Sequence, residues 1–368
     1  MNSHVVGGCS TYSKVWMNPP HQDYPVRALY PESGVRLRCR MESGEEKVFL
    51  DFTAALGAVF VGYEGVTEYI SGAPSYPLPH ESEEEAAALL CEATGFGLVR
   101  WCKNGGDAVE GAVRIARHVT KRGHIITNSY HGAHSDLIGA TSGKSHGVSS
   151  GLSWLVHPVR TPGALIERLL RDNDETAAVV MEPLTPACQD WHLAEVRHLC
   201  DKRGVVLIFD EVITGFRCRW GSAAPHVRPD LACYGKALAN GWPLAALTGR
   251  GDLMCLLERE VFMSATAAAE IISLQTCREN LVKLRGLDYR AVEERGARLG
   301  LALTGTVQGY PQRWQLVLEP VQHREFAVAL ARRGILVGHD FFIMAVHTDD
   351  DIDQAVQVIG EARAECSL

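Results

Sequence analysis

The sequence lacks the features that mark membrane-spanning, secreted and nucleic-acid-coating proteins. No apolar run approaches the length that crosses a bilayer, and the opening stretch MNSHVVGGCSTYSK has no basic region followed by an apolar core. The net charge of −8 argues against a protein that coats nucleic acid by bulk attraction, whereas a local basic groove and a nucleotide substrate stay open. We therefore expect a cytoplasmic protein that acts on small molecules and has no membrane contact.

The cysteines also lack any pattern. The chain has 11 of them, an odd number, and no two are spaced as Cys-x-x-Cys. This argues against a zinc ribbon and against a secreted disulfide framework. We expect no metal site, and mostly buried thiols in a reducing compartment.

Alternating apolar strands and amphipathic helices predict an α/β fold. With 368 residues, of which 46% are hydrophobic, the chain can bury one large core and a smaller second one. The order strand, helix, strand favours right-handed crossovers and a mostly parallel central sheet flanked by helices. The expected strands of this sheet are residues 124–127, 177–181, 205–209, 231–234 and 244–248.

Both ends of the chain show a different pattern. Residues 1–30 have little periodicity, so we expect an extended arm there. Two short apolar segments, 35–40 and 47–52, flank a turn-forming stretch and predict a β-hairpin. A small C-terminal α/β domain is expected to contain helices near residues 289–304, 324–333 and 352–364.

The stretch from Val205 to Lys236 carries the strongest chemical signal. Its first, β-branched apolar run ends in Asp210 and Glu211. This suits a buried parallel strand that delivers a carboxylate to the edge where open α/β sheets bind their ligands. A second apolar piece, Leu231 to Tyr234, leads to Lys236. A carboxylate and a lysine are thus expected at neighbouring strand ends.

This pairing suits a site for pyridoxal phosphate. The amine of Lys236 can hold the aldehyde of this cofactor as a Schiff base, while Asp210 facing the pyridine nitrogen keeps the ring electron-withdrawing. The alternative is an ordinary ion pair between the two side chains at the edge of the sheet.

The residues around this pair resemble a known family. The segments FDEVITGFR and PDLACYGKALANGWPLAALTG resemble the class III aminotransferases of pyridoxal-phosphate fold type I. The segments KNGGDAVEGAVRIAR and SYHGAHSD are most similar to the branch related to glutamate-1-semialdehyde aminomutase. The resemblance implies an N-terminal arm and hairpin (1–52) that packs with the small domain, a large cofactor-binding domain (53–273) and a small C-terminal domain (274–368).

A glycine pair at the start of a predicted helix is the candidate phosphate site. Backbone N–H groups at a helix N-terminus commonly bind phosphate, although a Gly-Gly pair is also typical of a simple turn. The resemblance places the family's phosphate-binding Ser-Gly-Thr at Asn104, Gly105 and Gly106. Because the threonine hydroxyl is missing here, we expect backbone donors to carry more of the phosphate binding. Asp107 is expected to cap this helix or to lie with the cofactor-binding residues.

The resemblance implies five further cofactor contacts. Tyr130 matches the aromatic residue that stacks on the pyridine ring, and Val212 matches the residue on the opposite face; the alternative for Tyr130 is a rim tyrosine without this role. His131 follows that aromatic residue, and Glu182 matches a Glu-Pro pair beside the cofactor. Thr266 matches a threonine that reaches the phosphate in the partner subunit, which implies a homodimer. The glycines that flank this threonine in the family are alanines here.

The resemblance implies a pyridoxal-phosphate-dependent aminotransferase that moves an amino group between an amino donor and a carbonyl substrate through an internal aldimine on Lys236. The same electron sink serves aminomutases, racemases and decarboxylases, so these stay open. A non-catalytic partner protein of the same fold is a further alternative.

A P-loop is excluded because NGGDAVEG lacks the required Lys and Ser/Thr. No arginine is marked as a carboxylate clamp, which favours an amine or keto substrate such as a sugar, a nucleotide or a nucleobase adduct.

Overall fold

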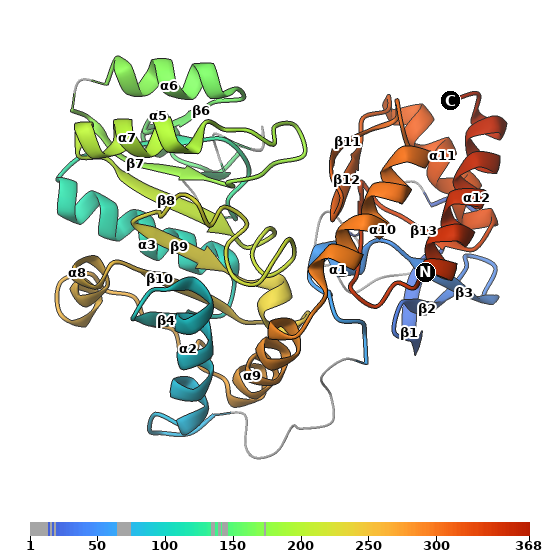
Figure 1. Ribbon diagram of the computed structural model, residues 1–368, viewed down its shortest axis with the longest axis horizontal. Coiled ribbons are helices and arrows are strands. Elements are labelled where there is room, and N and C mark those ends of the chain that lie inside the picture. Colours follow the sequence, from blue (N-terminus) through green and yellow to red (C-terminus); the bar gives the residue numbers. More distant parts are fainter. Residues whose placement is uncertain are drawn as a thin grey trace. The chain divides into compact units, whose positions relative to one another are not determined.

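The chain folds into two compact units. In this computed structural model the described residues are 14, 17, 20–64, 75–133, 137–138, 141, 146–172 and 174–368. The larger unit comprises Val66–Leu287, and the smaller unit comprises Met1–Gly65 together with Asp288–Leu368. Figure 1 labels the helices and strands of each unit.

The larger unit is built on a seven-stranded sheet with the order β4-β10-β9-β8-β7-β5-β6. Strands β6, β5, β7, β8 and β9 pair in parallel, whereas β10 runs antiparallel to both of its neighbours, β9 and β4. The expected α/β fold with a mostly parallel sheet is confirmed. The strands are β4 (Val99–Cys102), β5 (His124–Thr127), β6 (Val156–Pro158), β7 (Thr176–Met181), β8 (Val206–Glu211), β9 (Leu231–Tyr234) and β10 (Ala245–Gly249).

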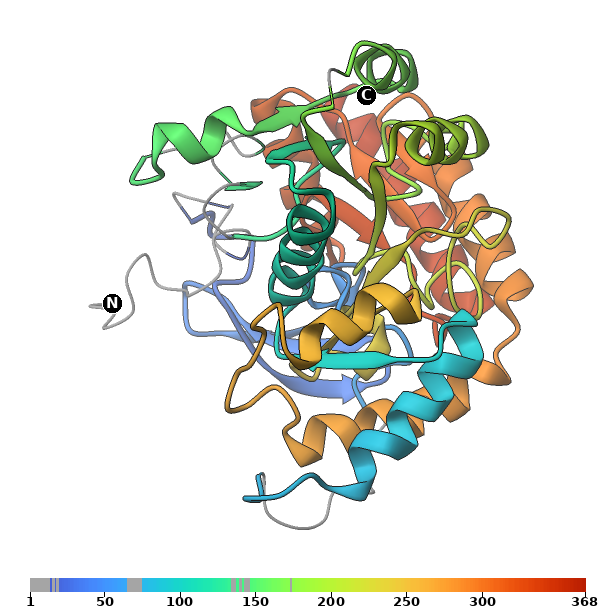
Figure 2. The same cartoon turned by 90° about the vertical axis from the view of Figure 1, so that its left-hand side faces the viewer.

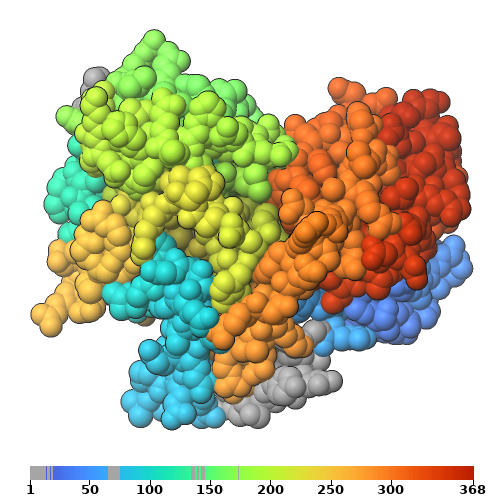
Figure 3. Space-filling view, viewed as in Figure 1, coloured from blue at the N-terminus to red at the C-terminus, as the bar shows by residue number. Residues whose placement is uncertain are grey.

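Helices cover both faces of this sheet. Helix α3 contacts β7 to β10, α7 contacts β8, and Figure 2 shows α3 and α7 on opposite sides of the central strands. Helices α2 and α9 lie side by side at the surface of the unit (Figure 3). The elements are α2 (Glu81–Thr94), α3 (Gly105–Thr120), α5 (Ser150–Trp154), α6 (Pro162–Leu170), α7 (Leu193–Arg203), the 3-10 helix η3 (Lys236–Ala239), α8 (Gly251–Met254), η4 (Cys255–Glu258) and α9 (Ile271–Arg285).

The central strands are buried on both faces because helices pack on both sides. Every residue of β7 and β8 is buried, which explains why their sequences are continuous apolar runs rather than alternating ones. Burial of these runs favours folding of this unit. The polar residues that follow the strands are delivered to one edge of the sheet.

The smaller unit contains two small sheets. The expected hairpin is present as β2 paired antiparallel with β3, and part of the expected extended arm forms β1 beside it. Residues 1–13, 15–16 and 18–19 of that arm lie outside the described part of the chain. The first sheet contains β1 (Arg27–Ser33), β2 (Arg36–Arg40), β3 (Glu46–Asp51) and β13 (Ile335–Leu336), and the second contains β11 (Val307–Tyr310), β12 (Arg313–Leu316) and β14 (Asp340–Phe342). The helices are α1 (Ala54–Gly57), α10 (Tyr289–Ala302), α11 (Pro320–Arg332) and α12 (Asp349–Cys366).

The boundaries of the two units differ from those expected from the sequence. They fall at 65/66 and 287/288 instead of 52/53 and 273/274. Helix α9, expected to open the small domain, packs on α2 and η3 and so belongs to the larger unit. Helix α1, expected in the large domain, contacts β14 of the smaller unit. Within the residues that the structure describes, no helix combines the length and the apolar character needed to cross a bilayer.

A buried histidine makes the stability of the smaller unit depend on pH. The ring of His347 stacks on Phe52, with centroids 4.5 Å apart, and its Nδ1 accepts the N–H of Met344 at 2.9 Å. Burial lowers the pKa of His347 to about 4 from an ordinary value of 6.5, although nearby Asp351 acts in the opposite direction. The folded state therefore favours the neutral ring.

Acidification should destabilise this unit through His347. Because the folded-state pKa is depressed, the stability is fully present above pH 6.5 and is lost as the pH falls toward 4; the loss at pH 5 is about 2 kcal/mol. Urea unfolding at pH 8 and pH 5 should show a smaller pH effect in His347→Asn than in the wild-type protein. The exposed His192→Asn is the matched control. An equal pH effect in His347→Asn and the wild type would contradict this assignment.

Candidate active site

Asp210 and Lys236 are brought to the ends of adjacent parallel strands. In the pairing of β8 with β9, Asp210 lies opposite Cys233, and Lys236 begins η3 directly beyond β9. Neighbouring strands are about 4.8 Å apart, so both side chains start from the same edge of the sheet. Lys236 has a positive φ of 49°, an uncommon conformation for a lysine that is typical of functional sites.

The turn that carries Lys236 is held by a buried asparagine of α9. The side-chain amide of Asn280 donates to the carbonyl oxygens of Ala237 and Leu238 at 2.6 and 3.0 Å. Asn280 is fully buried. The carbonyl of Ala237 also accepts the backbone N–H of Asn240 at 3.4 Å, so Asn280 adds a second donor there and supplies a donor to Leu238, and it holds the backbone next to Lys236.

The carboxylate of Asp210 is oriented by two donors. Its Oδ2 lies 2.7 Å from Nδ1 of His131, and its Oδ1 accepts the backbone N–H of Val212 at 3.0 Å. Asp210 is 5% exposed and His131 is 2% exposed. Since a carboxylate can only accept here, Nδ1 of His131 carries the proton of this bond.

Val212 packs between the start of α3 and the residue before Lys236. A Cβ on Gly105 would lie 2.7 Å from Cγ2 of Val212, and a Cβ on Gly235 would lie 3.4 Å from its Cγ1. Gly132 has a φ of 105° and approaches Gly106 so closely that a Cβ would lie 2.8 Å from the Cα of Gly106. Four separate segments of the larger unit therefore converge around Val212 and the N-terminus of α3.

Helix α3 presents its N-terminus at this point, and its cap is made by Asp107. The carboxylate of Asp107 accepts the backbone N–H and the side-chain amide of Asn104 at 2.8 and 3.1 Å. Gly105 and Gly106 are in the first turn, where backbone N–H groups and the helix dipole favour an anion. Asp107 thus uses its carboxylate in the cap, and its expected contact with the cofactor stays a prediction.

Tyr130 and Glu182 follow β5 and β7. Tyr130 is 55% exposed, and partial burial together with nearby Asp210 raises its pKa. Glu182 is buried, and its Oε1 accepts the hydroxyl of Ser129 at 3.1 Å. The side-chain amide of Asn128 donates to the carbonyl oxygen of Glu182 at 2.9 Å, and its Oδ1 accepts the N–H of Glu182 at 3.0 Å. These two bonds join the ends of β5 and β7.

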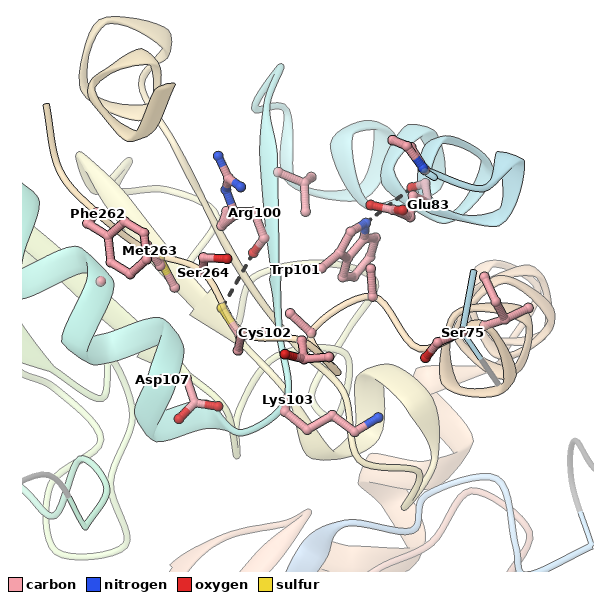
Figure 4. A pocket seen from close by; sticks show the side chains of 18 of the residues that line it. Ser75, Glu83, Arg100, Trp101, Cys102, Lys103, Asp107, Phe262, Met263 and Ser264 are labelled. Carbon is pink, nitrogen blue, oxygen red and sulfur yellow. Dashed lines mark hydrogen bonds between the residues drawn. The ribbon is translucent and has the colours of Figure 1, made fainter. Parts of the chain in front are cut away.

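Thr266 lies in a different environment. It is exposed in the turn before α9 and lines a cavity of about 510 Å³ along β4 and the start of α3, with Asp107 in the same lining (Figure 4). Lys103 lines the same cavity, and its Nζ contacts Oε2 of Glu270 at 3.1 Å. Glu270 caps α9 by accepting the N–H groups of Ile272 and Ser273. This contact ties the segment that carries Thr266 to the residue before the cap of α3.

Several supporting residues had no signal in the sequence motifs. Asn128, Ser129 and Asn280 act through hydrogen bonds to distant segments, which no local spacing encodes. Glu211 is a partial exception because it directly follows Asp210 at the end of an apolar run. It is fully buried and accepts bonds from Thr214 Oγ1, Ser222 Oγ and the N–H of Ala223, and burial raises its pKa.

Removing the amide of Asn280 should destabilise the protein and loosen the turn at Lys236. In Asn280→Ala the carbonyl of Leu238 loses the donor that Asn280 supplies and the carbonyl of Ala237 keeps only the N–H of Asn240, so we expect a loss of about 1–3 kcal/mol in the free energy of unfolding, measured by urea denaturation. The matched control is Val282→Ala on the exposed side of the same helix, which should change stability by less than about 0.5 kcal/mol. Equal effects of the two substitutions would refute the role given to Asn280.

Comparisons with known proteins identify the family. The model of the class-III aminotransferase family matches residues 38–281. The glutamate-1-semialdehyde 2,1-aminomutase of Methanothermobacter thermautotrophicus is 30% identical over 376 residues, covering 88% of this chain and 90% of that protein. Two solved structures share the fold. A transaminase with bound pyridoxal phosphate has a TM-score of 0.84 and 22% identity, and the match covers 99% of this chain and 95% of that one. A glutamate-1-semialdehyde aminomutase from Pseudomonas aeruginosa has a TM-score of 0.81 and 19% identity, and the match covers 99% of this chain and 92% of that one.

The residues of this site fit pyridoxal 5'-phosphate. A lysine and a buried, hydrogen-bonded carboxylate at adjacent strand ends suit its aldehyde and its pyridine nitrogen, and the first turn of α3 offers N–H groups for its phosphate. The matched family uses this cofactor, as the expected fold type I implies. The chain belongs to the class III aminotransferase family of pyridoxal-phosphate-dependent enzymes, in the branch related to glutamate-1-semialdehyde aminomutase.

Proposed function

We propose that the protein catalyses transamination, moving an amino group from an amino donor to a small carbonyl substrate, with Lys236 and Asp210 as the catalytic residues. The observation that carries this proposal is the placement of these two residues at adjacent ends of β8 and β9 in a class III aminotransferase chain. Bound pyridoxal phosphate supplies an electron sink for the bond that breaks at the substrate carbon.

Each residue then has a defined task. The Nζ of Lys236 binds the cofactor and, once released by the substrate amine, takes and returns the proton at the substrate carbon. Asp210, held by His131 and the N–H of Val212, keeps a negative charge next to the pyridine nitrogen. This charge favours a protonated nitrogen, which strengthens electron withdrawal.

The remaining predicted residues bind and orient. The N–H groups of Gly105 and Gly106 hold the phosphate, Tyr130 and Val212 cover the two ring faces, and Glu182 closes the polar side of the site. We also propose that the enzyme is a homodimer in which Thr266 reaches the phosphate of the other subunit, since this exposed residue lines a cavity at the start of α3. A cytoplasmic location remains a prediction from the sequence.

Aminomutation is the second candidate, because relatives with 30% identity are named glutamate-1-semialdehyde 2,1-aminomutases. The two reactions use the same residues and differ in where the nitrogen goes. A transaminase delivers the nitrogen of one molecule to another, whereas an aminomutase returns it to the same carbon skeleton.

Isotope transfer distinguishes the two reactions. Incubation with a panel of 15N-labelled amino donors and unlabelled keto acceptors should yield 15N in a product with the acceptor skeleton, detected by mass spectrometry. A product that keeps both its original skeleton and its own nitrogen, with only the position of the amino group changed, would replace transamination with aminomutation.

Replacing the lysine should abolish turnover. In Lys236→Ala the general base and the covalent attachment are both lost, so the turnover number should fall by about 10³-fold or more while weak cofactor binding remains. Lys202→Ala, an exposed residue on α7, is the control for loss of a positive charge. Activity retained in Lys236→Ala with an unchanged absorbance spectrum would refute the assignment of Lys236.

A further inference from the structure

We propose that Ser129 is the central link of a proton relay that connects Glu182 to Asp210 through His131. It is a positioning residue, because it acts on Asp210 through His131. The consequence for catalysis rests on the proposed role of Asp210 next to the pyridine nitrogen, whereas the relay itself is a property of the chain alone.

Three hydrogen bonds form a continuous path. Nδ1 of His131 lies 2.7 Å from Oδ2 of Asp210, and Nε2 of the same ring lies 3.2 Å from Oγ of Ser129. The Oγ of Ser129 lies 3.1 Å from Oε1 of Glu182. Asp210, His131 and Glu182 are 5%, 2% and 6% exposed, whereas Ser129 between them is half-buried. The path joins the end of β8 to the end of β7 through the loop after β5.

The protons of this path can be arranged in two ways that keep all three hydrogen bonds. The hydroxyl of Ser129 has one proton to donate. If it donates to Glu182, then Nε2 of His131 must donate to Ser129, and His131 carries a positive charge beside two carboxylates. If it donates to Nε2, then a protonated Glu182 donates to Ser129, and His131 is neutral. Both arrangements keep all three bonds and contain the same number of protons.

The two arrangements interconvert without any outside reactant. A proton passes from Oε1 of Glu182 to Oγ of Ser129 while the hydroxyl proton of Ser129 passes to Nε2 of His131. The reverse shift restores the first arrangement. Each shift changes the charge of the ring that contacts Asp210 by one unit, and so it changes how strongly Asp210 favours a proton on a neighbouring nitrogen. The charge of Asp210 also raises the pKa of Tyr130, the chain neighbour of His131.

A purely structural role does not require Ser129 to bond Glu182. Asn128 already joins the ends of β5 and β7 through two bonds to the backbone of Glu182. The bond from Ser129 adds a contact to the side-chain carboxylate, the one part of Glu182 that can change its charge. Ser129 also places this contact next to the only ring nitrogen of His131 that Asp210 does not use.

The test is a double-mutant cycle read out on His131 in the protein without cofactor. The ring nitrogens of 15N-histidine-labelled protein are titrated by NMR from pH 5 to 9, with His131→Gln assigning the signal. In the wild-type background, Glu182→Gln should lower the ratio of charged to neutral His131 by roughly tenfold, the usual effect of losing a nearby carboxylate. In the Ser129→Ala background the same substitution should change this ratio less than threefold. Ser129→Thr, which keeps the hydroxyl, should restore the coupling.

Equal effects of Glu182→Gln in the serine and alanine backgrounds would overturn the relay, and so would a ring that does not change its protonation in any variant. Urea unfolding of each variant shows whether that variant is folded. If Ser129→Ala is not folded, Ser129→Thr is compared with the wild-type protein instead. Because the readout needs neither cofactor nor substrate, a failed relay is distinguishable from a failed transaminase assignment, which the isotope experiment tests separately.

Discussion

The hydrogen-bonded carboxylate of Asp210 is the constraint on which the rest of this site depends. A charge at the buried end of a central strand is costly unless donors surround it. His131 and the N–H of Val212 meet that requirement, and they also fix the direction in which the carboxylate points. The tight packing of Val212 against Gly105 and Gly235 follows from the same arrangement, because the residue after the Asp-Glu pair must turn between the start of α3 and the end of β9.

The parallel sheet explains how distant residues act together. Strands β7, β8 and β9 end at one edge, so the residues that follow them are delivered to one site whatever their separation in the sequence. Hydrogen bonds from side chains to the backbone hold the segments around the site. Asn280 bonds the turn of Lys236, Asn128 bonds the end of β7, and Glu211 bonds the loop after β8. Precise placement of this kind is what a catalytic constellation needs.

The sequence predicted β5, β7, β8, β9 and β10 because strands buried on both faces are apolar runs, as in β7 and β8, but it did not predict the short edge strands β4 and β6. It also predicted that Asp210 and Lys236 would be neighbours, since both follow such runs. It did not predict that β10 is antiparallel, because an isolated apolar run has no direction. The contacts of Asn128, Ser129 and Asn280 were missed since their partners lie far along the chain. The unit boundaries differed because α9 packs on α2, a tertiary contact that helical periodicity does not reveal.

The most direct test of the account is to identify the residue that holds the cofactor. The protein loaded with pyridoxal phosphate is reduced with borohydride, which converts the link to a stable amine, and its proteolytic peptides are mapped by mass spectrometry. We predict that the reduced cofactor is found on Lys236 alone. Attachment to Lys103 or to any other lysine, or no attachment at all, would contradict the assignment of the active site.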